Sequence, residues 1–409
     1  MPRPAPPPLT RMEHPAKPAQ PETTVVSAPE DGSIRVALLL PLTGSNSAVG
    51  KAMLSAAQMA LFSFADKRFT LLIHDTRGAP EGAADAAKLA IGDGARLILG
   101  PLLSTSVLGM APVARQAGVP VIAFSSDRSV AGQGVYTLGF LPSDQVDRVV
   151  TFARAQGLQR FAALAPDNAY GRTVASALRR AVAQAGGKVS QLELYNPEAT
   201  DFSAVVRKLA DYDYRRAALL AQRKQLEGKE DEVSKRALKR LENLQTIGDL
   251  PYDALLVADG GKRLQAIAAL LPFYDIDPNQ VRMLGTGQWD EPGIGAEPAL
   301  VGGWYAAPSP AGRTGFEQEY ASLYGVPPPR LATIAYDAAA LAAVMAQSAG
   351  ENKYSAAVLT NPNGYAGRDG IFRFLLDGTA QRGFAILQVR QRDAVVINAA
   401  PQTFQALTN

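Results

Sequence analysis

The chain has 409 residues, of which 19% are charged and 47% hydrophobic, and its formal net charge at pH 7 is +3. These values are typical of a globular protein with two or three domains, and so small a charge on so long a chain does not indicate a nucleic-acid partner. The chain has no cysteine, which excludes disulfides, thiolate metal ligands and cysteine nucleophiles.

Residues 1–32 are rich in proline and contain almost no large apolar side chain. This composition predicts a disordered, semi-extended tether, and the alternative is an ordinary disordered tail. The segment has no apolar core of a signal peptide, and the chain has no run of about 18 apolar residues that would span a membrane. We expect a periplasmic protein, lipid-anchored through an N-terminal segment that has been removed.

From Ile34 onward, short apolar runs alternate with longer alanine-rich amphipathic segments. Strands are predicted at 34–40, 69–75, 96–100, 119–124, 160–165, 188–194, 216–220, 253–258, 281–285 and 301–306. Helices are predicted at 48–64, 79–92, 105–116, 143–156, 170–186, 201–211, 261–271, 313–324 and 331–349. This alternation indicates an α/β fold of βαβ units on parallel sheets. Because ten strands are too many for one comfortable sheet of this type, we expect two lobes, the second starting near Phe140 to Ser143.

The first loop, in "LLLPLTGSNSAVGKAM", has the order of parts of a nucleotide-binding P-loop. A P-loop places four residues between its first glycine and the Gly-Lys pair, and a Ser or Thr follows to hold Mg²⁺. Here five residues separate Gly44 from Gly50, and Ala52 stands in the place of the hydroxyl. We therefore predict that the loop is a cleft wall and binds no nucleotide.

Catalytic sets are missing from the sequence as well. Of the two histidines, His14 lies in the proline-rich segment and His74 ends a strand, with no nucleophile motif beside it. No metal-ligand set and no nucleophile–base pair are recognisable. The sequence predicts a protein that is not an enzyme and uses neither a metal nor a cofactor.

A charged segment at 222–250 interrupts the second half of the chain. In it, Val233, Ala237, Leu241 and Leu244 lie on one face of a predicted helix, which also carries Lys235, Arg236 and Lys239. Two interpretations remain open: a solvated excursion that packs one stripe on its own domain, or an element that docks a partner through those three cations.

Ligands in open α/β sheets bind beyond the carboxyl ends of the strands. The loops at these ends in the first half, "GPLLSTS" and "FSSD", are rich in hydroxyls and glycines, and Tyr170 follows a strand of the second half. Ser104 is predicted to cap the helix that begins near Thr105, where free amides favour an anion. The predicted ligand-binding residues at these ends are Ser104, Thr105, Ser125, Ser126, Asp127 and Tyr170.

Five segments together resemble the type I periplasmic binding fold, in the branch of the leucine/isoleucine/valine-binding proteins. They are "IRVALLLPLTGSNSAVGKAM", "LILGPLLSTSV", "AGVPVIAFSSD", "FAALAPDNAYGRTVASAL" and "LATIAYDAAALAA". The resemblance implies two Rossmann-like lobes with parallel sheets, joined by three crossings that we expect near Phe140, Ala306 and Gly370. Lobe 1 would comprise 33–141 and 307–370, and lobe 2 would comprise 142–306 and 371–400.

The resemblance also implies roles for single residues. Ser104 matches the serine that receives a ligand carboxylate, Ser125 the position whose carbonyl takes the ammonium group, and Tyr170 the second-lobe tyrosine. Asp127 stands where those binders usually keep a threonine. The sequence departs from the pattern where Gly287 and Gln288 replace the acid that pairs the ammonium group, which leaves Asp127 as its expected counter-charge. Through its matched position, Gln288 becomes the seventh predicted ligand-binding residue.

The charged segment, followed by "YDALLVADGGKRLQAIAALLPFYDID" and "MLGTGQWD", also resembles the C-terminal domain of lipoproteins that activate penicillin-binding proteins. That resemblance implies a peptidoglycan synthase as partner, and a tether suits such a lipoprotein. The alternative is a solute-binding protein that delivers branched-chain or related amino acids to the permease of an ABC importer. Both are non-catalytic envelope proteins of the leucine-binding-protein-like family.

Overall fold

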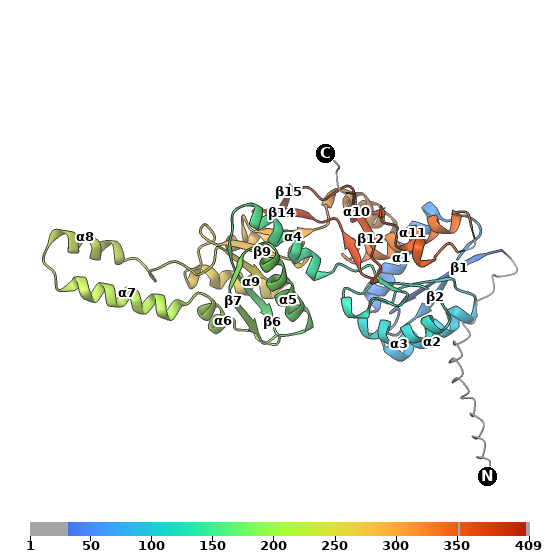
Figure 1. Cartoon of the computed structure of the whole chain (residues 1–409), viewed down its shortest axis with the longest axis horizontal. Helices are drawn as coiled ribbons and strands as arrows, with labels where there is room; N and C mark the ends of the chain where they lie inside the picture. Colours follow the sequence, from blue (N-terminus) through green and yellow to red (C-terminus); the bar gives the residue numbers. More distant parts are fainter. Residues whose placement is uncertain (1–31, 351, 406–409) are drawn as a thin grey trace, which may run out of the picture.

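The computed structural model describes residues 32–350 and 352–405 as two lobes that lie side by side (Figure 1). The predicted tether lies almost wholly outside these residues. The α/β fold class of two lobes built on parallel sheets, predicted from the sequence, is confirmed. No helix in the described part of the chain combines the length and the hydrophobicity that crossing a membrane requires.

Lobe 1 is built on a five-stranded parallel sheet in the order β2-β1-β3-β4-β5. Its strands are β1 (Ile34–Leu40), β2 (Phe69–Asp75), β3 (Leu97–Leu99), β4 (Val121–Ala123) and β5 (Val135–Thr137). Its helices are α1 (Ser47–Phe64), α2 (Pro80–Gly92), α3 (Ser104–Gln116), α10 (Pro310–Tyr324), α11 (Ala332–Gln347) and α12 (Ala356–Leu359). Helices α1 and α11 bury one face of the sheet, and α2 with α3 bury the other, as expected for strands with continuous apolar sequences.

Lobe 2 is built on a seven-stranded sheet in the order β15-β14-β10-β9-β8-β6-β7. Its parallel strands are β6 (Arg160–Pro166), β7 (Lys188–Tyr195), β8 (Ala254–Val257), β9 (Arg282–Gly285) and β10 (Trp304–Ala307). Two antiparallel strands, β14 (Ala385–Val389) and β15 (Ala394–Asn398), complete one edge. The covering helices are α4 (Pro142–Ala155) and α5 (Ala169–Gln184) on one face and α6 (Ser203–Leu209) and α9 (Gly261–Phe273) on the other.

The third crossing between the lobes was predicted in the wrong place. A small antiparallel sheet of β11 (Tyr365–Gly367), β12 (Gly370–Phe374) and β13 (Ala380–Arg382) follows α12. Phe372, Phe374 and Ala380 are buried in the core of lobe 1. The chain therefore enters lobe 2 between β13 and β14, and the segment from 371 to 382 belongs to lobe 1. The segment stays on lobe 1 because these apolar side chains pack into the core of that lobe.

The strand predicted at 216–220 was also wrong, because this segment lies inside helix α7 (Tyr212–Glu227). Helix α7 contains no β-branched residue, and its alanine, leucine, arginine and glutamine residues all favour helix. The periodicity of a short apolar run does not distinguish helix from strand, and here the intrinsic propensity of these residues favours the helix. The inserted element therefore begins at α7, before the predicted start at 222, and it connects α6 to β8.

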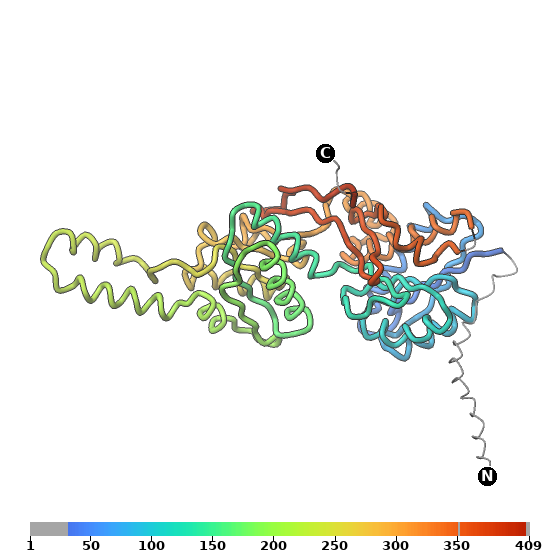
Figure 2. Tube along the Cα trace, viewed as in Figure 1, coloured from blue at the N-terminus to red at the C-terminus, as the bar shows by residue number. Residues whose placement is uncertain are grey.

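Helices α7 and α8 (Glu232–Leu241) pack together as a hairpin that projects from lobe 2, away from lobe 1 (Figures 1 and 2). At its base, the buried Arg215 donates to the carbonyls of Gly248 and Ala210, at 3.1 and 3.3 Å. Further out, Arg223 donates to the carbonyls of Glu242 and Leu244, at 2.9 and 3.2 Å. These bonds join the two helices and fix the hairpin to the lobe.

Candidate functional site

A cleft of about 540 Å³ lies between the lobes. Lobe 1 contributes the loops that follow β1, β3, β4 and β5, and lobe 2 contributes Tyr170 and the loop after β9. The site thus occupies the carboxyl ends of parallel strands in both lobes, where ligands bind in open α/β sheets. The cleft is lined by Asn46, Val49, Leu102, Leu103, Ser104, Phe124, Ser125, Ser126, Asp127, Gly139, Phe140, Pro142, Gln145, Tyr170, Gly287, Gln288, Asp290, Ala307, Pro308, Arg330, Leu331 and Ile334.

Six of the seven predicted ligand-binding residues line this cleft. Thr105 is not among the lining residues and is exposed to solvent. Ser104 is the first residue of α3, so the prediction that it caps the helix was wrong: the cap position is Leu103, with extended backbone and no side-chain cap bond. Because the Ser104 hydroxyl does not cap its own helix, it can bind another acceptor or donor. It lies beside the free amides of the first turn of α3.

The loop after β4 is organised by its own side chains. The Asp127 amide donates to Ser125 Oγ at 3.1 Å. Asp127 Oδ1 accepts from both the amide and the hydroxyl of Ser129, at 2.9 and 2.7 Å, and so caps the short helical turn Arg128–Val130. Ser125 is buried, whereas Ser126 and Asp127 are exposed at the rim of the cleft. The Asp127 carboxylate therefore already has a structural role in its loop.

Tyr170 is the main lobe 2 contribution to the cleft. Asn168 caps α5 by accepting from the Gly171 amide at 3.0 Å, which places Tyr170 in the first turn of the helix. The Tyr170 hydroxyl shares a hydrogen bond of 2.8 Å with Thr286 Oγ1. Burial raises the pKa of the Tyr170 phenol, so this side chain stays neutral and presents a ring and a hydroxyl.

A side chain at position 287 would require the Gln145 side chain to move. The Gly287 amide donates to Gln145 Oε1 at 2.9 Å, and a Cβ on Gly287 would lie 2.8 Å from Gln145 Nε2. Gln288 follows and lines the cleft. The wall of lobe 2 between β9 and α4 is thus formed by neutral amides.

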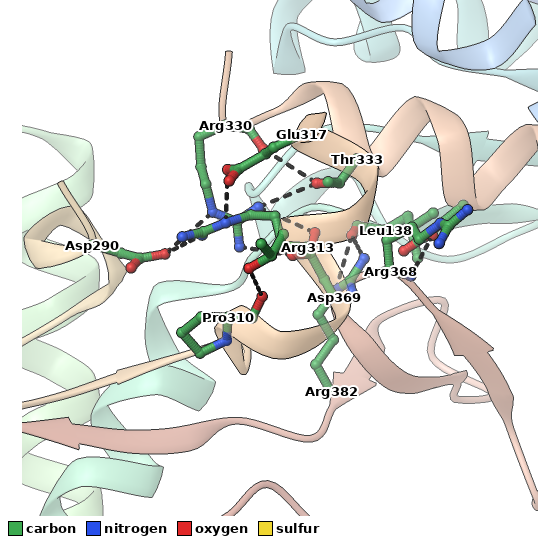
Figure 3. A network of polar contacts seen from close by, with 12 residues as sticks. Leu138, Asp290, Pro310, Arg313, Glu317, Arg330, Thr333, Arg368, Asp369 and Arg382 are labelled. Carbon is green, nitrogen blue, oxygen red and sulfur yellow. Dashed lines mark hydrogen bonds and ion pairs between the residues drawn. The ribbon is translucent and has the colours of Figure 1, made fainter. Parts of the chain in front are cut away.

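A network of charged residues at the cleft was missed by sequence reasoning (Figure 3). Asp290, which is on lobe 2, accepts from Arg313 at 2.5 Å and from Arg330 at 3.4 Å, and both arginines are on lobe 1. Arg330 also pairs with Asp369, at 2.9 Å, and stacks on the Phe140 ring at 4.6 Å from its centroid. Asp290 follows the short turn Gly287–Trp289 and Arg330 follows a proline-rich loop, and neither segment carries a pattern that indicates pairing.

Behind this network lie two buried carboxylates, Asp337 and Asp369. Burial, together with the neighbouring Asp369, raises the pKa of Asp337 to about 7. Arg382 is buried beside them between the rings of Phe140 and Phe372, at 4.8 and 5.2 Å from the centroids. The Arg382 guanidinium donates to the Leu138 carbonyl at 2.8 Å, so this charge braces the first crossing between the lobes.

The loop after β1 is a cleft wall, as its departures from a P-loop indicated. Its Leu42 amide donates to Asp75 Oδ1 at 2.8 Å, and its Thr43 hydroxyl donates to Asp75 Oδ2 at 2.6 Å. These bonds fix the start of the loop to the end of β2. Gly50 serves packing, because a Cβ there would lie 2.0 Å from the Pro41 carbonyl oxygen.

The predicted partner-binding residues lie apart from the cleft. Lys235, Arg236 and Lys239 are exposed on α8, as is Arg240. The opposite side of α8 packs on α7 through half-buried Ala237, Leu238 and Leu241 and buried Ser234. The predicted apolar stripe is therefore only partly correct, since Val233 is 77% exposed.

A family model described as periplasmic binding protein matches residues 33–394 of the chain. A protein named uncharacterized protein RP748, from Rickettsia prowazekii (strain Madrid E), is 24% identical over 174 residues. That match covers 42% of this chain and 46% of the relative, so the chain aligns with less than half of the relative's length.

Two solved structures show the same fold. A putative branched-chain amino acid ABC transporter from Rhodospirillum rubrum has a TM-score of 0.71 at 20% identity, covering 89% of this chain and 100% of that one. An ABC transporter solute-binding protein from R. palustris, in complex with benzoate, has a TM-score of 0.60 at 16% identity, covering 90% of this chain and 97% of that one.

Proposed function

The chain belongs to the periplasmic binding protein family, and on that premise we propose that it is a non-catalytic protein of the cell envelope that binds a small molecule between its lobes. The observation that carries the proposal is the cleft of about 540 Å³, to which both lobes contribute apolar and hydrogen-bonding side chains. Its size falls in the range of small-molecule sites. The solved relatives named above are transport proteins, so the leading form of the proposal is a solute-binding protein that serves an ABC permease.

A binding role, as opposed to catalysis, agrees with how the polar groups of the cleft are used. Ser125 Oγ accepts a backbone amide, and the Tyr170 hydroxyl is paired with Thr286. Neither hydroxyl is hydrogen-bonded to a group that could act as a general base, which a nucleophile requires.

We propose that the carboxylate of the ligand binds at Ser104 and the first-turn amides of α3. Losing one hydrogen bond to a charged group costs about 1.5–3 kcal/mol, so Ser104→Ala should weaken binding of an acidic ligand roughly ten- to a hundredfold. Isothermal titration calorimetry on the two proteins measures this difference. Ser190→Ala, on the edge strand β7 and outside the cleft, is the control and should leave affinity unchanged. Equal affinities of Ser104→Ala and wild type would reject the assignment.

One feature, the projecting α7–α8 hairpin, favours a second function. In that function, a lipid-anchored form of this chain would activate a penicillin-binding protein. The hairpin lies away from the cleft and contributes no residue to its lining. Its outer α8 face presents Lys235, Arg236, Lys239 and Arg240, all exposed. We propose that this face docks an envelope partner, with a peptidoglycan synthase as the first candidate and the permease of an importer as the alternative.

Charge reversal tests the docking proposal. The triple variant Lys235→Glu, Arg236→Glu and Lys239→Glu should lose at least tenfold in affinity for a purified peptidoglycan synthase, measured by biolayer interferometry. The control reverses three exposed charges of lobe 1, with Lys51→Glu, Lys67→Glu and Arg115→Glu. Equal losses in both triples would indicate non-specific charge attraction, and no binding by wild type would remove this partner.

A further inference from the structure

We infer that the cleft selects an apolar monocarboxylic acid without an amino group, of the aryl or branched-alkyl type, over the corresponding α-amino acid. The inference rests on the proposed ligand-binding function and adds the chemical class of the ligand. It is carried by the charges that face the cleft and by the contacts those charges already make.

An ammonium group needs an anionic partner, and two carboxylates line the cleft among the described residues, Asp127 and Asp290. Asp127 is at the exposed rim, and its Oδ1 accepts two bonds from Ser129 that shape the loop. The Asp127 carboxylate therefore lies at the surface of the site and already has a hydrogen-bond partner. An ammonium group that paired with it would remain largely in solvent, where an ion pair is worth little.

Asp290 is already neutralised. Its side chain is only 9% exposed and pairs with the two guanidinium groups of Arg313 and Arg330, at 2.5 and 3.4 Å. Arg330 is held in place by Asp369 and by the Phe140 ring, and Arg313 by Glu317 at 3.0 Å. An ammonium group would have to compete with two anchored arginines for one carboxylate.

The groups that remain suit an acid. Arg330 is the single cationic side chain among the described residues that line the cleft, and it also pairs with Asp290 and Asp369. Ser104 adds a hydroxyl that does not cap its helix. Gln145, Gln288 and Tyr170 are neutral hydrogen-bonding groups on the opposite wall, suited to a hydroxyl or an amide. The remaining walls are apolar and would enclose a ring or a branched chain; they are formed by Val49, Leu102, Leu103, Phe124, Phe140, Pro142, Leu331 and Ile334.

Pairs of ligands that differ only in the amino group test the inference. Wild-type protein, unfolded and refolded to remove any retained molecule, is titrated in a calorimeter with 4-methylpentanoate against leucine and with 3-phenylpropionate against phenylalanine. Benzoate is added as the smallest aryl acid. We expect at least one acid to bind, and each acid that binds to do so at least tenfold more tightly than its amino counterpart.

The outcomes separate the inference from the function on which it rests. Leucine or phenylalanine binding as tightly as its deaminated partner would overturn the inference and leave the ligand-binding function in place. Binding of neither member of any pair, with no small molecule retained in native mass spectra of the purified protein, would overturn both. Arg330→Gln removes the charge of Arg330 and should lower the affinity for the acid about tenfold. The control, Glu317→Gln, changes a residue outside the cleft lining and should leave that affinity within threefold of wild type.

Discussion

Single glycines permit the close approach of helix and loop at the cleft. Gly50 in α1 and Gly171 in α5 occupy equivalent places in the two lobes, where a Cβ would lie 2.0 Å from the Pro41 oxygen and 1.8 Å from the Pro166 oxygen. Each glycine therefore lets the helix after a strand pack directly on the backbone at the end of that strand. The glycine that gave the first loop its likeness to a P-loop is explained by packing.

Gly50→Ala should destabilise the protein by about 1–3 kcal/mol, because the added methyl group meets backbone that cannot rotate away. Urea denaturation followed by circular dichroism measures the change. The control is Gly92→Ala at the end of α2, where nothing lies within 4 Å of the new Cβ and the helical backbone suits alanine. That variant should be neutral or stabilised by about 0.4–1 kcal/mol. Equal effects at both positions would contradict the packing argument.

The buried carboxylate of Asp337 should make stability depend on pH. Its pKa is raised to about 7 from the ordinary value of 3.8, so between about pH 4 and 7 the folded protein binds a proton that the unfolded chain has released. Stability from this group is therefore highest below that window and falls as the pH rises through it. The cause is the cost of keeping a charge buried beside Asp369.

Asp337→Asn removes this titration and keeps an oxygen that can accept the Arg368 amide, now bonded at 2.7 Å. The variant should gain stability relative to wild type as the pH rises from 4 to 7, by at most about 1.4 kcal/mol per pH unit. Urea denaturation at pH 4.5, 5.5, 6.5 and 7.5 measures the difference in unfolding free energy between the variant and wild type. Parallel stability curves for the two proteins would show that Asp337 does not titrate in this range.

Among the elements, the α7–α8 hairpin contributes little to the core. In its outer part, Lys224 to Asn243, the side chains are exposed or half-buried except Ser234, whereas Arg215 and Leu219 at the base are buried. Two exposed apolar side chains, Tyr214 and Leu220, at 73% and 50% exposure, lie on α7. The outer part is thus a separable surface element, and only its base is part of the lobe.

Replacing Lys224 to Asn243 with a short Gly/Ser link should leave a folded protein. Arg223 bonds to the Leu244 carbonyl, so the two cut ends lie close together and closing the loop costs little. We expect the melting temperature to fall by less than about 4 °C, ligand binding in the cleft to be unchanged, and capture of the envelope partner to be lost. A collapse in melting temperature would make the hairpin a structural brace, and unchanged capture would leave it without a docking role.

At the scale of the whole molecule, the pairs formed by Asp290 connect lobe 2 to lobe 1 next to the second crossing (Figure 3). This contact sets the relative position of the two walls of the cleft. Because Asp290 and Arg313 are mostly buried, removing one partner leaves charge without its counter-ion in a poorly solvated place.

Asp290→Asn should therefore destabilise the protein by about 2–4 kcal/mol, less than the full cost of breaking a buried pair because Glu317 and Asp369 still accompany the two arginines. Chemical denaturation measures the loss. Asp85→Asn, which breaks an exposed pair with Arg77, is the control and should not change stability measurably. If both variants behave alike, the contact between the lobes is no stronger than a surface ion pair.

The sequence by itself determined the fold class and the order of most strands and helices, because these follow from local hydrophobic periodicity. It determined the family through the resemblance of five segments to known members. Strands β1 and β2 have the bounds that were predicted, and six of the predicted cleft residues share one cavity. Tertiary structure decided what depends on contacts distant in sequence. The pairing of Asp290 with Arg313 and Arg330 and the place of β12 and β13 in lobe 1 leave no periodic signal, since each depends on which surfaces meet after the lobes have formed.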